Sequence, residues 1–209
     1  RTSLTRVNLS KCGLGTEAAK ALAHAFAAST SLTQLDLSDN QLCGVDYKST
    51  GTYSAHGIEA IADALGVNTS LTEVKLLDNK FGNVGWCAIF DALRGNPQNK
   101  MVTWELYDEG INLTTAKSLG AYVSTSASLT SLDISENRIK GSGKAFGEAL
   151  QANSSITELK MVDCCLNSED IKGLVGGIAV NPSLTKLDVR ENLMGNDGEQ
   201  ALCKVVKAK

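Results

Sequence analysis

The sequence predicts an α/β protein in which seven short strands alternate with helices. An eleven-residue segment of the form L-x-x-L-x-L-x-x-N/C-x-L recurs along almost the whole chain, and a stretch with a helical period of about 3.6 residues follows it. This arrangement makes the whole of residues 1–209 one repeat domain. The segments begin at Leu4, Leu32, Leu71, Met101, Leu129, Ile156 and Leu184.

Each segment is expected to hold one strand of three or four residues. The clearest copies read LTQLDLSDNQL from Leu32 and LTSLDISENRI from Leu129. In both copies apolar and polar residues alternate, so that Leu35 and Leu37 point inward while their neighbours point outward.

Each stretch between segments is expected to form one helix. In TEAAKALAHAFAA, which begins at Thr16, the residues Ala18, Leu22 and Phe26 share one face. The corresponding inward pairs elsewhere are Ile61 and Leu65, Ile89 and Leu93, Leu119 and Val123, Leu174 and Ile178, and Leu202 and Val206.

The spacing of the segments locates an insertion in the second repeat. The intervals between starts are 28, 39, 30, 28, 27 and 28 residues. The inward pair of the second helix is displaced by the same eleven residues that lengthen its repeat, so the insertion lies before that helix, near residues 43–53. The two extra residues of the third repeat follow its helix, at residues 96–100.

These segments resemble the leucine-rich repeats of the ribonuclease-inhibitor type, which also occur in NOD-like receptors and in Ran GTPase-activating proteins. The resemblance covers seven registered copies and almost the whole chain. It implies a right-handed βα solenoid, a horseshoe segment with parallel strands on the concave side and helices on the convex side.

The resemblance also implies a role for the ninth position of the segment, where an asparagine amide bonds to the backbone of neighbouring turns. Asn40, Asn79, Asn137 and Asn192 match this position, and Cys12 and Cys164 are the usual substitute. Glu109 departs from the pattern, as does Trp104 at an inward leucine position, so the fourth repeat is expected to be the least regular.

Composition excludes several classes of partner. Twenty basic and 23 acidic residues give a net charge of −3, which offers no electrostatic reason to expect nucleic acid. No apolar run reaches the roughly 18 residues of a membrane span, and no signal peptide is recognisable at the start. Six cysteines without a pairing pattern fit free thiols in a reducing, cytoplasmic setting.

Catalytic, metal and cofactor sites are not expected, and neither is a small-molecule substrate. The sequence from Gly13 to Ala18 has the form G-x-G-x-x-A and precedes Asp36, as in a dinucleotide fingerprint. Its glycines recur in later repeats, however, and its strand is too short for a dinucleotide-binding core. His24 and His56 are expected at the surface, and Cys164 is explained by the repeat. The sequons at Asn8, Asn68, Asn112 and Asn153 are interpreted as coincidental.

The concave face is expected to be acidic. At the third, fifth, seventh and eighth positions of the segments the chain carries 12 acids and 6 bases, whereas the remainder has 14 bases and 11 acids. An acidic groove would attract a basic protein partner. The partner-binding acids predicted here are Asp36, Asp39, Asp78, Glu105, Asp108, Asp133, Glu136 and Asp163.

Apolar and aromatic residues add a second kind of contact. Leu77, Tyr107 and Val162 replace small or polar residues at the seventh position, and the first two are expected on neighbouring strands about 5 Å apart. The insertion adds Tyr47 and Tyr53 in a loop rich in glycine, serine and threonine. Both groups are predicted to contact the partner.

Three functions are compatible with this pattern. The first is a non-catalytic protein–protein interaction module, and the second is a structural scaffold subunit of a large assembly. The third is a regulator of a small GTPase, against which the insertion counts because it carries Lys48 and no arginine. Because the chain begins at Arg1 and ends at Lys209 within the last helix, we expect a fragment or a component of something larger.

Overall fold

The computed structural model describes residues 3–46 and 48–208, and there it confirms seven strands that alternate with seven helices. All seven strands have three residues, as the alternation predicts. The strands are β1 (Arg6–Asn8), β2 (Gln34–Asp36), β3 (Glu73–Lys75), β4 (Thr103–Glu105), β5 (Ser131–Asp133), β6 (Glu158–Lys160) and β7 (Lys186–Asp188). The helices are α1 (Thr16–Ala28), α2 (His56–Val67), α3 (Gly82–Arg94), α4 (Leu113–Thr125), α5 (Gly143–Ala152), α6 (Ser168–Val180) and α7 (Gly195–Ala208).

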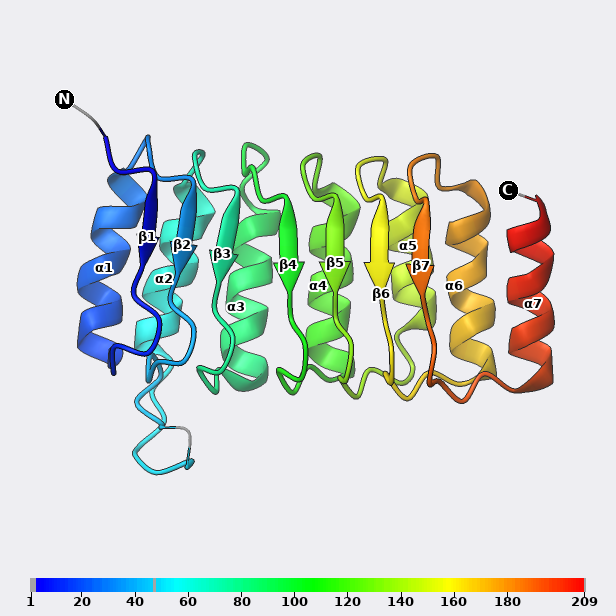
Figure 1. Ribbon diagram of the computed structural model, residues 1–209, viewed down its shortest axis with the longest axis horizontal. Helices are drawn as coiled ribbons and strands as arrows, with labels where there is room; N and C mark the ends of the chain where they lie inside the picture. The colour runs from blue at the N-terminus through cyan, green and yellow to red at the C-terminus, as the bar shows by residue number, and fades with distance from the viewer. Residues whose placement is uncertain (1–2, 47, 209) are drawn as a thin grey trace. The chain divides into compact units, whose positions relative to one another are not determined.

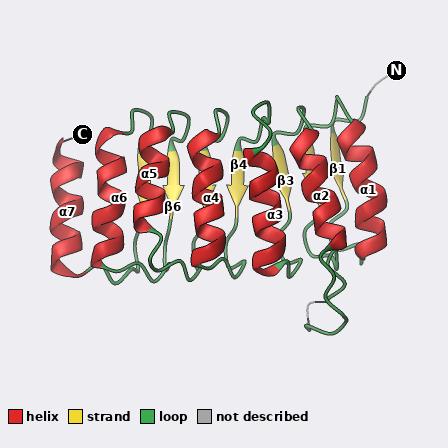
Figure 2. Cartoon of the chain, turned by 180° about the vertical axis from the view of Figure 1, so that it is seen from behind, coloured by secondary structure: helices red, strands yellow, loops and turns green. Residues whose placement is uncertain are grey.

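The chain forms two compact units, Arg1–Glu105 and Leu106–Lys209. In the first unit β1 to β4 lie side by side in chain order, and in the second β5 to β7 do the same. The strands are parallel, with Arg6 opposite Gln34 and Gln34 opposite Glu73. Within each unit the helices cover one face of the strand layer (Figures 1 and 2). We call the uncovered side the strand face.

The core of each repeat lies between its strand and its helix. Leu35 and Leu37 of the second repeat are no more than 2% exposed, as predicted. Trp104 occupies the inward leucine position of β4, where its ring packs edge-on against Trp86 at 6.2 Å and against Phe90 at 6.0 Å. A cluster of aromatic rings therefore fills the core of the third and fourth repeats.

Three of the helix positions predicted to point inward are not fully buried. Leu22 and Leu202 are half-buried, and Val206 is 64% exposed, so the prediction for Val206 is wrong. Helix α7 packs against α6, and Val206 lines an open hollow together with Ile178 and Leu184. Leu22 lies on α1, which packs against α2.

The predicted asparagine ladder is present. The Asn40 side chain accepts hydrogen bonds from the backbone N–H groups of Cys12 and Leu14 and donates to the carbonyl oxygens of Leu9 and Leu37. Asn137 and Asn192 bond in the same way to the preceding repeat. Because buried backbone groups must be paired, this position admits few other residues.

Asn79 completes only half of this pattern. Its amide nitrogen donates to the carbonyl oxygens of Leu37 and Leu76, but its buried Oδ1 has no hydrogen-bond partner in the described structure. The donors expected for this oxygen belong to the second repeat, at the place where the insertion departs. The insertion thus alters the ladder locally.

A second asparagine ladder joins the ends of the helices and was missed from the sequence. Asn68 and Asn153 are the C-caps of α2 and α5. Asn153 donates to the carbonyl oxygens of Val123 and Ser126 in the preceding repeat, and its Oδ1 accepts from the N–H groups of Ser155 and Ile156. Asn68, Asn96 and Asn181 make corresponding bonds.

Helices α5 and α6 approach one another through glycine. A methyl group on Gly147 would fall on the carbonyl oxygen of Gly173, and one on Gly177 would fall on the carbonyl oxygen of Gly147. A methyl group on Gly143 would likewise fall on the carbonyl oxygen of Asp170. Backbone therefore contacts backbone along this helix pair, and a side chain at these positions has no space.

Candidate functional site

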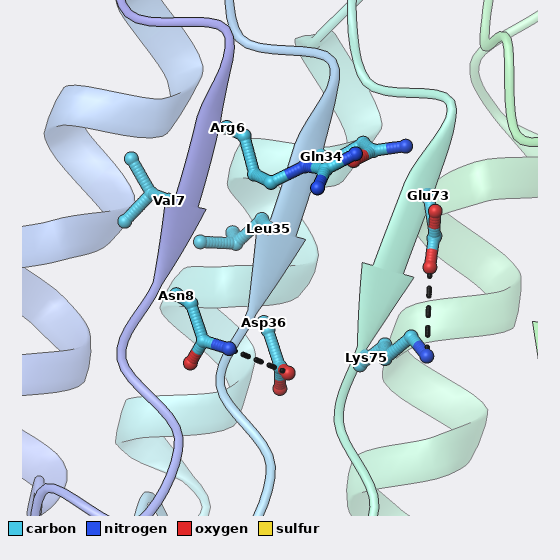
Figure 3. Close-up of a pocket in the computed structure, with 8 residues that line it drawn as sticks. All are labelled: Arg6, Val7, Asn8, Gln34, Leu35, Asp36, Glu73 and Lys75. Atoms are coloured by element: carbon cyan, nitrogen blue, oxygen red, sulfur yellow. Dashed lines mark hydrogen bonds and ion pairs between the residues drawn. The ribbon is translucent and has the colours of Figure 1, made fainter.

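The strand face of the first unit holds charged side chains that are mostly paired. Lys75 lies 3.6 Å from Glu73, and the Asn8 amide donates to Asp36 at 3.3 Å (Figure 3). Lys75 is also 3.6 Å from Glu105. Glu105 and Asp36, both predicted to bind a partner, therefore already have neighbours within the unit.

The acids on the strands of the second unit are all paired. Lys160 lies 3.6 Å from Asp133 and 3.8 Å from Glu158, and Lys186 lies 3.5 Å from Glu158. The Arg190 guanidinium donates to both oxygens of Asp188 and holds the pKa of that carboxyl below its usual value. The three acids of these strands are thus neutralised by three bases.

The acids at the fifth position also have a structural role. The carboxylates of Asp36 and Asp133 each accept a hydrogen bond from the backbone N–H two residues on, at 3.0 Å and 3.1 Å. This turn lets the chain leave the strand, and aspartate favours it. Part of the acidic pattern in the sequence is therefore explained by local backbone geometry.

The acids that stay unpaired lie at the eighth position. In the described part of the second unit, the structure shows no ion pair for the four carboxylates at this position, although a tyrosine donates to one of them. All four residues are exposed, and each comes three residues after the end of a strand. We call this set the acidic rim: Asp108, Glu136, Asp163 and Glu191.

The backbone at the eighth position explains part of the rim. Every eighth-position residue has a positive φ, from 48° at Asp163 to 59° at Glu191. Aspartate tolerates this left-handed conformation better than most residues. Glutamate has no such preference, so backbone geometry does not account for Glu136 and Glu191.

In the first unit the eighth position is less acidic. Asp39 lies 3.9 Å from Lys11, the one basic residue at this position. Asp39 and Asp78 are both exposed, and both have positive φ. The unpaired negative charge of the strand face is therefore concentrated in the second unit.

Tyr107 lies beside the acidic rim and is half exposed. Its hydroxyl donates a hydrogen bond to the Glu136 carboxylate, which raises the pKa of the Tyr107 phenol. Burial, together with the nearby charges of Asp108 and Asp133, acts in the same direction. The Tyr107 hydroxyl is therefore directed toward Glu136 of the rim.

This hydrogen bond predicts a measurable titration. Only the neutral phenol donates to Glu136, so Tyr107 should ionise above the ordinary tyrosine value of about 10. Glu136→Gln should lower the Tyr107 pKa because it removes the adjacent negative charge, and Asp108→Asn should lower it less. The measurement is a pH titration of the Tyr107 ¹³Cζ resonance by NMR. A wild-type value at or below 10 would contradict the assignment.

The structure describes Leu77 and Val162, two of the other residues predicted to contact the partner, but not Tyr47. Val162 and Leu77 are both half-buried on the strand side, Val162 in the second unit and Leu77 in the first. Tyr107 belongs to the second unit, so the adjacency of Leu77 and Tyr107 stays a prediction. Tyr47 lies outside the described residues.

The insertion is closed by an antiparallel pair of residues. It connects β2 to α2, and Val45 pairs with Gly51 in antiparallel fashion. The Asp46 carboxylate accepts hydrogen bonds from the Thr50 hydroxyl and from the backbone of Thr50 and Lys48, which lowers the Asp46 pKa. In Figure 1 the insertion projects beyond the end of α2.

Tyr53 ties the base of the insertion to the third repeat. Its hydroxyl donates to the carbonyl oxygen of Phe81 at 2.8 Å, while 44% of the residue stays exposed. Tyr53 therefore has a structural contact in addition to the partner contact predicted for it.

Two of the sequons are parts of the repeat. Asn68 and Asn153 are 5% and 2% exposed, and their amide nitrogens donate to backbone carbonyls. The serine two residues later donates from its hydroxyl to the previous repeat, as Ser155 does to Leu129. The N-x-S pattern at these positions is thus a helix cap, and Asn112 caps α4.

The described residues show no cluster suited to metal chemistry. No group of three or more histidine, cysteine or acidic side chains is placed to hold a metal ion among them. His24 and His56 are exposed, as predicted. Burial raises the pKa of the Cys164 thiol to about 12, so this residue is not poised as a nucleophile. In the part that the structure describes, no helix has the length and apolar character needed to cross a membrane.

Comparison with known proteins identifies the repeats. The family model described as Leucine Rich repeat matches residues 2–23, 28–42, 125–143 and 180–203. The chain is 38% identical over 48 residues to NACHT, LRR and PYD domains-containing protein 3 of Rattus norvegicus and to its counterpart in Mus musculus. This segment covers 23% of the chain and 5% of the length of each relative.

Two solved structures are similar to this chain. One is the actin-binding site 2 of leiomodin-1, with a TM-score of 0.47 and 20% identity over 60% of this chain and 72% of the other. The other is the tropomodulin C-terminal domain of Caenorhabditis elegans, with a TM-score of 0.49 and 13% identity over 91% of this chain and 92% of the other.

Strand–helix units joined by an asparagine ladder define an α/β repeat protein. With the family match added, the chain contains leucine-rich repeats at the matched residues, as the resemblance implied. The ribonuclease-inhibitor type is a finer assignment and stays a prediction.

Proposed function

We propose that the chain is a non-catalytic protein–protein interaction module whose second unit binds a basic protein partner at the acidic rim. We also propose a reducing, intracellular location. The thiols of Cys43 and Cys164 support that location, because both are buried and donate to backbone carbonyls.

The distribution of paired and unpaired charge is the observation that carries this proposal. On the strand face of the second unit, Lys160, Lys186 and Arg190 neutralise the acids of the strands themselves. The excess negative charge is left on the four rim carboxylates. Strands in a sheet lie about 4.8 Å apart, so successive rim residues repeat at about that spacing.

Aromatic and apolar side chains beside the rim support a specific contact. Tyr107 is half exposed and donates a hydrogen bond to Glu136, and the half-buried Val162 follows β6 in the same unit. Tyrosine buries a large surface at low entropic cost, whereas exposed charges mainly govern association rate and specificity. Together they suit a partner that presents lysine or arginine next to an apolar group.

Charge reversal at the rim tests the proposal. We expect a variant with Asp108, Glu136 and Asp163 changed to lysine to lose partners that the wild-type chain captures from a cell lysate. For a partner identified by mass spectrometry, affinity measured by titration calorimetry should fall at least about tenfold. Binding by the wild-type chain should also weaken as salt is raised.

The matched control reverses three acids on the helices of the same unit. Glu148, Glu169 and Glu199 are exposed on α5, α6 and α7, and their change to lysine alters the net charge equally. Full affinity is expected for this control. Equal losses in the rim and control variants, or captured partners that are not basic, would refute the acidic-rim proposal.

A further inference from the structure

Arg6 and Gln34 lie next to one another at the edge of a hollow on the strand face of the first unit. The hollow has a volume of about 230 Å³, and residues of β1, β2 and β3 line it (Figure 3). Arg6 and Gln34 are opposite each other in the parallel register, so their side chains leave the sheet side by side.

These two side chains differ from their neighbours in having no partner. Among the described residues at the third and fifth positions, the other charged groups are held in ion pairs or, for Asp36, in hydrogen bonds. Within residues 3–46 and 48–208, no ion pair or hydrogen bond is formed by the Arg6 guanidinium or the Gln34 amide. Donors and an acceptor are therefore available at one end of the hollow.

The arrangement of nearby acids explains why Arg6 stays unpaired. Asp36 accepts from the Asn8 amide and from the backbone of Ser38. Glu73 is two strands away from Arg6, about 10 Å by the strand spacing, and is 3.6 Å from Lys75. Neither acid forms an ion pair with Arg6.

A guanidinium beside a primary amide matches one kind of ligand. The planar fork of arginine binds both oxygens of a carboxylate, and an amide nitrogen can donate to the same group. We propose that Arg6 and Gln34 form a subsite for an acidic side chain, glutamate or aspartate, of a protein partner. The subsite has the opposite charge preference to the acidic rim and goes beyond the function proposed above.

The backbone favours an acidic side chain over a chain terminus. Terminal carboxylates are captured by backbone N–H groups that form a nest. Here nearby backbone N–H groups are used in the sheet, since those of Leu9 and Leu37 donate to the backbone carbonyl oxygens of Asp36 and Lys75. Donors for a ligand therefore come from side chains that project above a sheet, where an extended partner segment has access.

A peptide titration tests the subsite directly. The probe is the blocked peptide acetyl-Gly-Glu-Gly-amide, added to the ¹⁵N-labelled chain while the Arg6 Nε–H and the Gln34 side-chain amide are followed by NMR. We expect both signals to shift and saturate at millimolar peptide. The same peptide with glutamine in place of glutamate should shift neither, and Arg6→Gln should weaken binding at least about tenfold.

Arg190 provides the matched control. It also projects from the strand side, but Asp188 already occupies its guanidinium through three hydrogen bonds. The Arg190 Nε–H should stay unshifted during the titration, and Arg190→Gln should leave the affinity unchanged. The triple lysine variant of the acidic rim should also bind the peptide normally, which separates this subsite from the rim.

Three results would overturn the proposal. The first is an equal response to the glutamate and glutamine peptides. The second is unchanged binding by Arg6→Gln. The third is tighter binding of acetyl-Gly-Gly-Gly with a free terminal carboxylate, or of inorganic phosphate, because either ligand would mean that the subsite does not select an acidic side chain.

Discussion

Replacing Gly177 with alanine is expected to destabilise the protein by about 3 kcal/mol, near the upper end of the usual cost of overpacking. The added methyl group would fall on the carbonyl oxygen of Gly147, with the Gly147 carbonyl carbon at 2.7 Å and its Cα at 2.8 Å. Backbone atoms of a helix cannot rotate away as a side chain can, so α5 and α6 would have to separate. The measurement is urea denaturation followed by far-ultraviolet circular dichroism.

The neighbouring Gly176 supplies the control. A methyl group there meets no atom within 4 Å, and the residue is exposed on the same helix. Gly176→Ala should therefore stabilise the protein by up to about 1 kcal/mol through helix propensity. Trp86 and Trp104, the two tryptophans of the chain, both lie in the first unit, so fluorescence reports that unit separately. Similar unfolding midpoints for the two alanine variants would contradict close packing of α5 on α6.

The repeat itself could be predicted from the sequence because each strand and helix buries the same positions. Apolar residues at fixed spacing place Leu35 and Leu37 in the core, and the displaced helix pair locates the insertion before α2. Periodicity describes what a repeat buries against its neighbours. It is less reliable at Val206, which is 64% exposed and lines an open hollow.

The helix-cap ladder was missed because its signal resembles another motif. Asn68 and Asn153 begin N-x-S sequences, which were interpreted as coincidental sequons. Their recurrence three residues before a repeat start could have identified them, since Asn181 stands in the same place before Leu184. The close approach of α5 and α6 was equally missed, because glycine in a helix carries no apolar signal.

The acidic face could be predicted as a composition but not as a surface. A count over four positions treats Asp133 and Asp163 alike, whereas Lys160 lies 3.6 Å from Asp133 and the structure shows no ion pair for Asp163. Pairing depends on which residues stand opposite in the register, which the count ignores. Because the count ignores the register, it also gave no sign that Arg6 is unpaired. Arg6 adds to the number of bases, although it has no acid to pair with in the described structure.

Removing the Asp170 carboxylate is the second change with a large expected effect. Asp170 is 4% exposed, and its oxygens accept hydrogen bonds from the backbone N–H groups of Gly141, Gly143 and Asn167 at 2.9 Å, 3.0 Å and 3.1 Å. The residue thus caps α6 and also joins it to the start of α5 in the preceding repeat. An unpaired buried donor costs about 1–3 kcal/mol, so Asp170→Ala should destabilise the protein by about 3 kcal/mol or more.

Two further variants distinguish the hydrogen bonds from the charge. Asp170→Asn keeps one side-chain oxygen for Gly141 and Gly143 but loses the acceptor for Asn167, so about half of the destabilisation is expected. Glu169→Ala removes an exposed carboxylate 3.0 Å from Lys172 and should cost less than about 1 kcal/mol. Urea denaturation measures all three changes. If Asp170→Ala cost no more than Glu169→Ala, the three N–H groups would not depend on this carboxylate, and the link between α5 and α6 would rest on the glycine contacts alone.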